Sequence, residues 1–212
     1  MHKLIIFDFD GTLADTWNSI NKCMQWTFRD HELECYEEML LYDLIGTPLV
    51  EMIEILSKGK GDAEQITETY RKYYTKEGHE LTRLFKGSIE AVQGLHEKGY
   101  KLAVLSNKSE PGVQRAVKRT GLSPYIQDVF GEREGRLGKP SPDSFLMDIY
   151  PRFGIEPADC LMVGDAIPDL AYAQACGMPS CWASFGFGPE KECLSYKPSY
   201  IINDISELTD IL

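Results

Sequence analysis

Apolar and polar residues follow two different patterns along this chain. Residues 3–9 form a short apolar run rich in isoleucine and phenylalanine, which predicts a buried strand ending at Asp10-Gly11. Between residues 15 and 85 apolar positions recur every three or four residues, as they do on one face of a helix. From Gly87 onward, short apolar runs alternate with helical patterns. The chain therefore combines one strand, a long helical segment and a repeated alternation of helix and strand.

Three helical faces are predicted between residues 15 and 85. Two breaks separate them, at residues 46–48 and 58–62, where glycine, proline and charged residues gather. The apolar positions that define the faces are Ile20, Met24 and Phe28, then Leu49, Ile53 and Leu56, and then Ile66, Tyr70 and Tyr73. We expect an all-helical unit inserted after the first strand.

The rest of the chain predicts a parallel sheet covered by helices on both faces, because strands that alternate with helices form this architecture. We predict strands at residues 101–105, 129–130, 160–163 and 180–183, and helices at residues 88–98, 111–120, 142–153, 169–176 and 205–212. The fold class is thus α/β, a doubly wound parallel sheet. Its core is predicted to comprise residues 1–15 and 86–212, and the inserted helical cap residues 16–85.

The overall charge narrows the range of partners. The chain has 22 Lys and Arg against 33 Asp and Glu, which gives a net charge of −11. Such acidity repels nucleic acid and anionic membranes, so neither is an expected partner. No apolar run approaches the roughly 20 residues that span a bilayer, and residues 4–9 are too short for a signal peptide. We expect a cytoplasmic protein that binds any anionic substrate through a local arrangement of charges.

Polar residues follow the predicted strands, at the edge where open α/β sheets bind their ligands. These segments are residues 8–12, Ser106-Asn107, residues 138–140 and Gly164-Asp165. Taken alone, each has a plain structural explanation: a turn, a helix cap, a solvated Lys139, or an acid such as Asp169 at a helix start. Together they supply the carboxylates, hydroxyl and ammonium that transfer a phosphoryl group through a covalent aspartyl phosphate.

Asp8 and Asp10 carry the most specific signal. Residues two apart in a strand share a face, so both carboxylates can point into one crevice while Phe7 and Phe9 pack the other way. A hairpin turn at Asp10-Gly11 would require a second strand directly afterwards, but a helical pattern follows. Two acids at the end of a buried strand are costly without a metal ion or a cationic partner.

With these residues the chain resembles the haloacid dehalogenase superfamily. The four segments that are similar to its four motifs, in order, are Asp8-x-Asp10-Gly11-Thr12-Leu13, Ser106-Asn107, Lys139 and Gly164-Asp165-x-x-x-Asp169. The helical insertion between the first two motifs resembles the all-helical cap of that family. The dipeptides that look closest to its phosphoglycolate phosphatase-like branch are Asp15-Thr16, Ile45-Gly46 and Asn107-Lys108.

The resemblance implies a role for each of these residues. Asp8 would be the nucleophile, and Asp10 would protonate the leaving oxygen and later deprotonate the attacking water. The implied cofactor is Mg²⁺, which prefers oxygen ligands, here from Asp8, the backbone carbonyl of Asp10, Asp165 and Asp169. The phosphate would bind to the turn that contains Gly11 and Thr12, to Ser106 and to Lys139, with Asn107 in support.

The function that the resemblance implies is hydrolysis of a small phosphorylated metabolite, with 2-phosphoglycolate as the first candidate. Sugar phosphates, nucleoside monophosphates cleaved by a 5′-nucleotidase, and pyrophosphate are alternatives. A phosphomutase of the β-phosphoglucomutase type would share all four motifs. A haloacid dehalogenase would need neither Mg²⁺ nor Asp10, and a non-catalytic module would be expected to have lost its acids. The protein is expected to be a monomer or a homodimer.

Two further features concern the surroundings of the site. Residues 131–137 are more charged than expected just before Lys139. Arg83 and Lys86 are expected to border the crevice, near the predicted hinges at residues 14–16 and 83–87. Either one is a candidate to meet a substrate carboxylate, although surface charge beside a hinge is the favoured interpretation.

Overall fold

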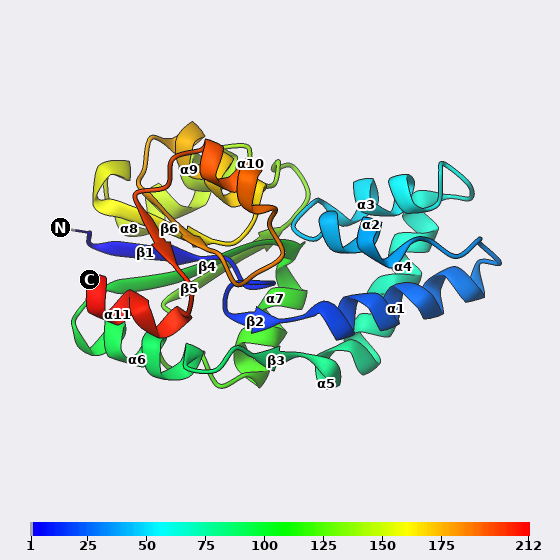
Figure 1. Cartoon of the computed structure of the whole chain (residues 1–212), viewed down its shortest axis with the longest axis horizontal. Coiled ribbons are helices and arrows are strands. Elements are labelled where there is room, and N and C mark those ends of the chain that lie inside the picture. The colour runs from blue at the N-terminus through cyan, green and yellow to red at the C-terminus, as the bar shows by residue number, and fades with distance from the viewer. Residues whose placement is uncertain (1) are drawn as a thin grey trace.

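A six-stranded parallel sheet forms the centre of the protein in a computed structural model, which describes residues 2–212 (Figure 1). The strands lie in the order β5-β4-β1-β6-β7-β8. Their bounds are β1 Leu4–Phe7, β4 Lys101–Ser109, β5 Asp128–Glu132, β6 Cys160–Gly164, β7 Ser180–Ala183 and β8 Tyr200–Ile202. The chain runs from β1 outward to β4 and β5, and then returns to the other side of β1 with β6. This order confirms the predicted doubly wound sheet.

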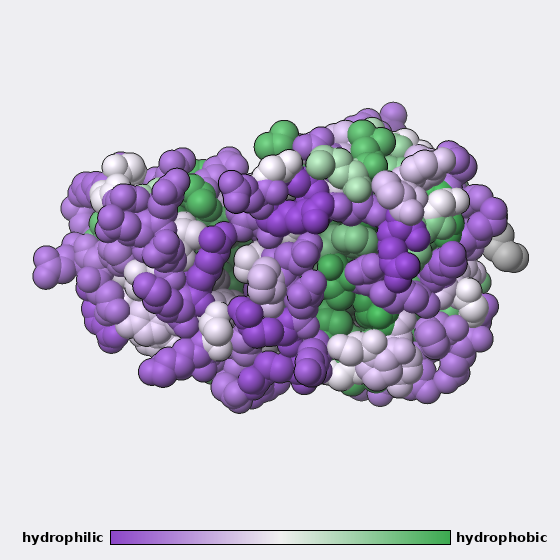
Figure 2. Space-filling view, turned by 180° about the vertical axis from the view of Figure 1, so that it is seen from behind, coloured by the Kyte–Doolittle hydropathy of each residue, from purple (hydrophilic) through white to green (hydrophobic). Residues whose placement is uncertain are grey.

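Helices cover both faces of this sheet because side chains alternate along each strand. From β1, Ile5 and Phe7 enter one apolar core, and Leu4 and Ile6 enter another on the opposite face. The first core is closed by α6 Ser88–Glu97, α7 Glu110–Arg119 and α11 Leu208–Ile211. The second is closed by α8 Tyr150–Phe153 and α9 Ile167–Cys176, while α10 Glu190–Ser195 packs beside α9. From behind, the molecular surface is mostly hydrophilic, with apolar residues gathered on the half that holds the sheet (Figure 2).

The helical segment, residues 16–85, lies beyond one end of the sheet (Figure 1). It contains α1 Trp17–Asp30, α2 Glu38–Asp43, α3 Leu49–Leu56, α4 Ala63–Tyr73, a π-helical turn Tyr74–Gly78 and α5 His79–Leu81. These elements surround a third apolar core, which includes Met24, Ile53 and Ile66 and also Phe187 from the loop after β7. Two short antiparallel strands, β2 Ala14–Asp15 and β3 Arg83–Leu84, carry the chain into and out of the segment. The proposed boundaries between core and cap fall beside this ribbon and stay predictions.

Several elements differ from the sequence prediction in detail. The helix expected at residues 142–153 consists of a π-helical turn, Phe145–Ile149, followed by α8. The buried row of α4, Ile66 and Tyr70, continues four residues later at Tyr74 in the π-helical turn, so that Tyr74 rather than Tyr73 is buried. Strand β8 was not predicted, because three residues are too few to show a period.

Candidate active site

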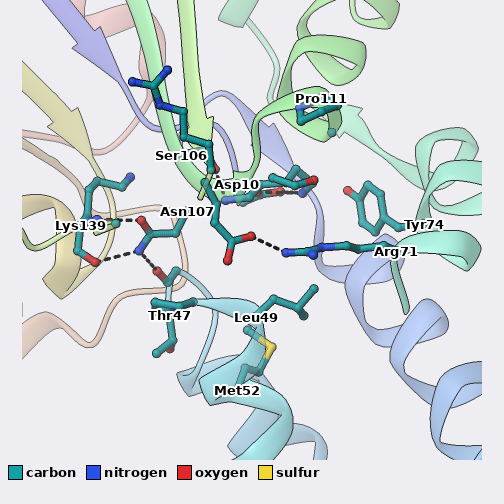
Figure 3. Close-up of a pocket in the computed structure, with 18 of the residues that line it drawn as sticks. Asp10, Thr47, Leu49, Met52, Arg71, Tyr74, Ser106, Asn107, Pro111 and Lys139 are labelled. Carbon is teal, nitrogen blue, oxygen red and sulfur yellow. Dashed lines mark hydrogen bonds and ion pairs between the residues drawn. The ribbon is translucent and has the colours of Figure 1, made fainter. Parts of the chain in front are cut away.

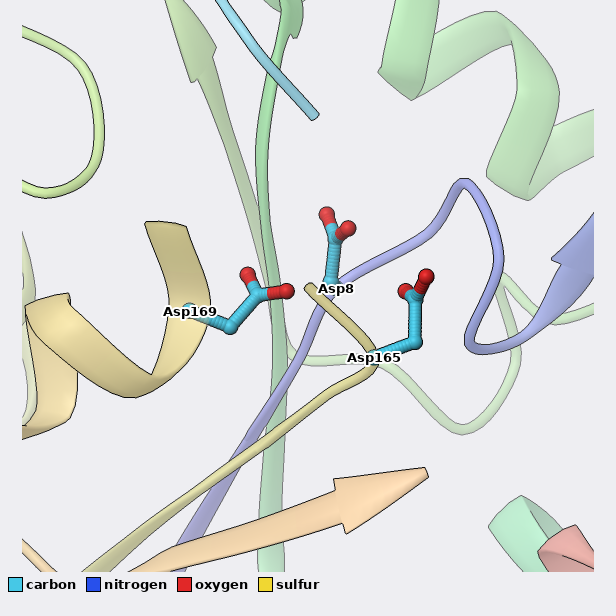
Figure 4. Close-up of side chains that lie close together, drawn as sticks. All are labelled: Asp8, Asp165 and Asp169. Atoms are coloured by element: carbon cyan, nitrogen blue, oxygen red, sulfur yellow. The ribbon is translucent and has the colours of Figure 1, made fainter. Parts of the chain in front are cut away.

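Three acids that are far apart in the chain meet beside the point where the strand order reverses. Strands β1 and β6 are neighbours, and Phe7 pairs with Val163, so Asp8 and Asp165 emerge close together at the carboxyl edge. Asp169 adds its carboxylate from the first turn of α9. Oxygen atoms of the three side chains lie within 4.8 Å of one another, and all three residues are buried (Figure 4). This edge is where open α/β sheets bind their ligands.

The ammonium of Lys139 lies between two of these acids. Its Nζ atom is 2.9 Å from Oδ1 of Asp8 and 2.6 Å from Oδ1 of Asp169. The same atom donates a hydrogen bond of 3.0 Å to the carbonyl oxygen of Leu105. The side chain of Lys139 is 2% exposed, so the interpretation as a solvated loop lysine is wrong.

The charges at the site do not balance within the protein. Three carboxylates face one ammonium, which leaves two negative charges in a buried place. Burial raises the pKa of Asp8 to about 7, against the opposing effect of Lys139 and with a further increase from Asp169. Burial, followed by the charges of Asp169 and Asp8, also raises the pKa of Asp165 well above its ordinary value.

The donor atoms of this site suit a divalent cation. All three side chains offer carboxylate oxygens, the ligands that Mg²⁺ prefers. Oδ1 of Asp8 is buried and accepts no hydrogen bond of good geometry, although Lys139 is near. A cation of two positive charges would match the excess negative charge and favour the ionised form of each acid. The residues present therefore fit the metal that the sequence motifs implied.

The turn after Asp8 holds Asp165 in place. Thr12 Oγ1 donates to Asp165 Oδ1 at 2.8 Å, and the backbone amide of Phe187 donates to Oδ2 at 2.8 Å. Gly11 has a φ of 88°, and a Cβ atom there would overlap with the carboxylate of Asp165. The amide of Gly11 donates to the carbonyl of Ala14. Phosphate binding by Gly11 and Thr12 stays a prediction, since this amide and the Thr12 hydroxyl already have partners.

Asn107 fixes the loop that carries Lys139. Its Nδ2 atom donates to the carbonyl oxygens of Lys139 and Gly46, each at 2.9 Å, and its Oδ1 atom accepts from the amide of Lys139 at 2.8 Å (Figure 3). Gly46 belongs to the helical segment, so Asn107 also joins that segment to the sheet. Ser106 precedes Asn107 at this edge of the sheet, and its hydroxyl accepts a hydrogen bond from the amide of Lys108.

Comparison with known proteins identifies the family. A model described as haloacid dehalogenase-like hydrolase matches residues 5–183, which include all four motif segments. The chain belongs to the haloacid dehalogenase-like hydrolase family. The resemblance inferred from Asp8, Ser106, Lys139 and Asp165 is thereby confirmed.

Members of this family with curated names match the chain over nearly its whole length. A phosphoglycolate phosphatase from Vibrio vulnificus (strain YJ016) is 26% identical over 219 residues, which cover 99% of this chain and 96% of the relative. The pyrophosphatase PpaX from Oceanobacillus iheyensis is also 26% identical, over 99% of this chain and 96% of the relative. Relatives with two different named activities are therefore equally similar.

Solved structures support the fold of this haloacid dehalogenase-like hydrolase. A haloacid dehalogenase-like hydrolase from Bacteroides fragilis superposes with a TM-score of 0.91 at 23% identity, covering 98% of this chain and all of the other. A hydrolase of the same family from Streptococcus pneumoniae gives 0.89 at 23% identity, over 99% of this chain and 98% of the other. At this identity the likeness establishes the α/β architecture with its helical insertion.

Lys108 entered the sequence analysis only as part of the Asn107-Lys108 dipeptide, without a role in the site. Its Nζ atom lies 2.8 Å and 2.9 Å from the two carboxylate oxygens of Asp10 and 4.2 Å from the ring centre of Tyr74. Burial alone lowers the pKa of Lys108, but the charge of Asp10 outweighs it and places that pKa above its ordinary value. The position directly after Asn107 was the only signal available in the sequence.

A cavity of about 750 Å³ opens between the sheet edge and the helical segment (Figure 3). The sheet side contributes Asp8, Asp10 and Lys139, and the helical side contributes Leu49, Met52, Tyr70, Arg71 and Tyr74. Asp8, Asp10 and Lys139 therefore share one space with a largely apolar wall, whereas the predicted acids Asp165 and Asp169 are not among the residues that line it. Among residues 2–212 no helix combines the length and apolar character needed to cross a membrane.

The two basic residues expected at the border of the crevice do not line this cavity. Arg83 donates instead to the backbone carbonyls of Glu80 and Thr82, which agrees with the favoured interpretation of surface charge beside a hinge. Lys86 is likewise absent from the cavity wall within the described part of the chain. The charged loop at residues 131–137 does reach the wall, and Arg136 there is buried against Asp148.

Proposed function

We propose that this hydrolase is a Mg²⁺-dependent phosphatase that cleaves a small phosphate monoester through a phosphorylated Asp8. One observation carries the proposal: the carboxylate of Asp8 lies where Asp165, Asp169 and Lys139 converge. A nucleophilic carboxylate needs positive charge around the group it attacks, and this position offers both a lysine and a donor set for a cation.

The reaction would proceed in two displacements at phosphorus. In the first, an oxygen of Asp8 attacks the phosphorus atom, the bond to the leaving oxygen breaks, and Asp10 gives a proton to that oxygen. In the second, water attacks the aspartyl phosphate, Asp10 takes a proton from the water, and the bond to Asp8 breaks. Inorganic phosphate leaves, and both acids return to their initial forms.

The remaining residues would bind and position the reactants. Lys139 would neutralise part of the phosphate charge, and Ser106 would donate a hydrogen bond to a phosphate oxygen. Mg²⁺ would be held by Asp8, Asp165, Asp169 and the backbone carbonyl of Asp10. A carboxylate and a phosphate dianion about 4 Å apart repel by roughly 8 kcal/mol at an effective dielectric constant of about 20, and the charge of the bound cation would offset this repulsion. Lys108 would position the carboxylate of Asp10 through both of its oxygens.

The names of the relatives support a small phosphorylated substrate. We place 2-phosphoglycolate first, because phosphoglycolate phosphatases match this chain over 99% of its length and the dipeptides Asp15-Thr16, Ile45-Gly46 and Asn107-Lys108 resemble that branch. Pyrophosphate is the second candidate, because pyrophosphatase PpaX matches equally well. A mutase of the β-phosphoglucomutase type would return the phosphoryl group to the sugar, so its product would be an isomerised sugar phosphate rather than free phosphate.

Phosphate release from p-nitrophenyl phosphate, 2-phosphoglycolate, pyrophosphate and β-glucose 1-phosphate tests the proposal. Activity should disappear in EDTA and return with added Mg²⁺. Rapid quenching followed by borohydride reduction and peptide mass spectrometry should locate the acyl phosphate on Asp8. Turnover that persists in EDTA would contradict the metal role, and a phosphorylated residue other than Asp8 would contradict the assignment of the nucleophile.

A further inference from the structure

Arg71 is the one charged side chain that the helical segment contributes to the cavity wall within residues 2–212. Its neighbours on that wall include Leu49, Met52 and Tyr70, which are apolar or aromatic. The phosphate end of a substrate is expected near Lys139, at the sheet edge. A leaving group would therefore extend toward the wall that carries Arg71 (Figure 3).

The guanidinium of Arg71 pairs with Glu132, a partner that a substrate anion can replace. One of its terminal nitrogens lies 2.5 Å from Oε2 of Glu132, at the end of β5, and Nε of Arg71 is buried without a hydrogen-bond partner. The side chains of Arg71 and Glu132 are 42% and 29% exposed. An ion pair this open to water is weak, so an anion that also satisfies Nε competes well for the guanidinium.

The other cations on the cavity wall also have partners. Lys139 faces Asp8 and Asp169, and Lys108 holds both oxygens of Asp10. Arg133 and Arg136 both pair with Asp148, and Arg115 donates to the hydroxyl of Thr75. Arg71 differs from all of these in lying on the helical wall, toward which the leaving group would extend, so it is best placed to meet a charged group there.

We propose that Arg71 binds a second anionic group of the substrate and that Glu132 competes for the same guanidinium. The inference rests on the proposed phosphatase function and assigns to one residue the recognition of the substrates proposed there. The preferred substrates are phosphate esters or anhydrides whose leaving group bears a carboxylate or a second phosphate. The planar guanidinium suits either group, because it can donate two parallel hydrogen bonds.

A purely structural role predicts a different pattern of effects. If the pair served only to fasten the helical segment to the sheet, removal of either Arg71 or Glu132 would impair every substrate in the same direction. If Arg71 binds the substrate and Glu132 competes, the two substitutions act in opposite directions, and only on charged leaving groups.

The experiment compares kcat/KM for two substrate pairs: 2-phosphoglycolate with 2-hydroxyethyl phosphate, and pyrophosphate with methyl phosphate. The ratio within a pair, measured on one preparation, is independent of the fraction of protein that is folded. Arg71→Gln should lower the charged-to-neutral ratio about 10- to 100-fold, the loss expected for hydrogen bonds to a charged group. Glu132→Gln should raise it about two- to fivefold. Lys72→Gln, at the next and exposed position of α4, removes the same charge and should leave the ratio unchanged.

The pair of substrates that responds to Arg71→Gln identifies the anion as a carboxylate or a phosphate. An unchanged ratio in both pairs would overturn the proposal, as would equal losses in Arg71→Gln and Glu132→Gln, or an equal loss in Lys72→Gln. If the wild-type protein releases phosphate but Arg71→Gln leaves the charged-to-neutral ratio of kcat/KM unchanged, only the proposed role of Arg71 fails. If it releases none from these substrates or from p-nitrophenyl phosphate, the proposed function fails as well.

Discussion

Replacing Asp8 by asparagine should abolish turnover and yet stabilise the protein when no metal is present. The substitution keeps the shape of the side chain and removes one of the three carboxylates that share the site. At 4.8 Å and an effective dielectric constant of about 20, each pair of carboxylates repels by about 3.5 kcal/mol. Asp8 takes part in two such pairs, and its attraction to the ammonium of Lys139 at 2.9 Å stabilises it by about 6 kcal/mol at the same dielectric constant.

Burial decides the balance against the charged form of Asp8. The residue is 3% exposed, and withdrawing a carboxylate from water costs several kcal/mol. The pKa of Asp8 accordingly rises from 3.8 to about 7, and this difference corresponds to roughly 4 kcal/mol of destabilisation at neutral pH and above. Because the folded-state pKa lies above the unfolded-state value, the penalty is absent below about pH 4 and grows as the pH rises to about 7. With some relaxation of the site, we expect Asp8→Asn to gain about 2–4 kcal/mol at a pH of about 8.

Thermal and urea unfolding in EDTA measure this gain. Each kcal/mol corresponds to a rise in Tm of about 2–4 °C for a domain of this size. Asp210→Asn, at an exposed position of α11, is the control and should change stability by less than about 0.5 kcal/mol. Mg²⁺ should stabilise the wild type more than Asp8→Asn, which would lack one of the proposed ligands. An Asp8→Asn protein that is no more stable than the wild type in EDTA, or a gain that does not shrink as the pH falls toward 4, would refute the reasoning.

Three other substitutions test separate parts of the structure. Lys139→Ala should lower kcat/KM for p-nitrophenyl phosphate about 100- to 1000-fold, and steady-state kinetics that match the wild type would exclude its role in phosphate binding. Gly186→Ala should destabilise the protein by about 1–3 kcal/mol, because the added methyl group would overlap with Asp165. The same overlap should weaken Mg²⁺ binding measured by calorimetry. Unchanged Mg²⁺ affinity would mean that Asp165 is not a ligand. Burial lowers the pKa of His79 from 6.5 to about 4, so folding stability should fall as the pH drops from about 6.5 to 4. His79→Phe can keep the edge contact with Tyr74 and should reduce this loss of stability, as measured by urea titrations at several pH values. An identical pH profile for the variant and the wild type would show that His79 does not titrate in this way.

The convergence of Asp8, Lys139 and Asp165 could be predicted because it depends on topology alone. Parallel strands present their carboxyl ends at one edge of a sheet, so residues that follow those ends are brought together without any knowledge of packing. The alternation of helices and strands after residue 87 was sufficient to predict such a sheet. The hydrogen-bond partners of each side chain could not be predicted in this way, and the hydroxyl of Thr12, which donates to Asp165, is an example.

The placement of two side chains in the site could not be predicted from the sequence, for different physical reasons. Lys108 lies where β4 continues past Leu105 with a shift in its pairing to β5, and this irregularity decides whether the side chain faces Asp10 or solvent. Arg71 reaches the cavity only because of how α4 is placed above the sheet edge, which depends on packing across the whole helical segment. Strands β2 and β3 have two residues each, so no period exists to predict them.

The ribbon of β2 and β3 has a consequence for how such proteins diversify. Ala14 pairs with Leu84 and Asp15 with Arg83, so the two ends of the helical segment are adjacent in space. A longer, shorter or unrelated insertion could therefore join these two strands without a change in the register of the six-stranded sheet. If the helical segment selects the substrate, as proposed for Arg71, exchanging this one contiguous stretch of sequence would change substrate choice and leave Asp8, Lys139 and Asp165 in place.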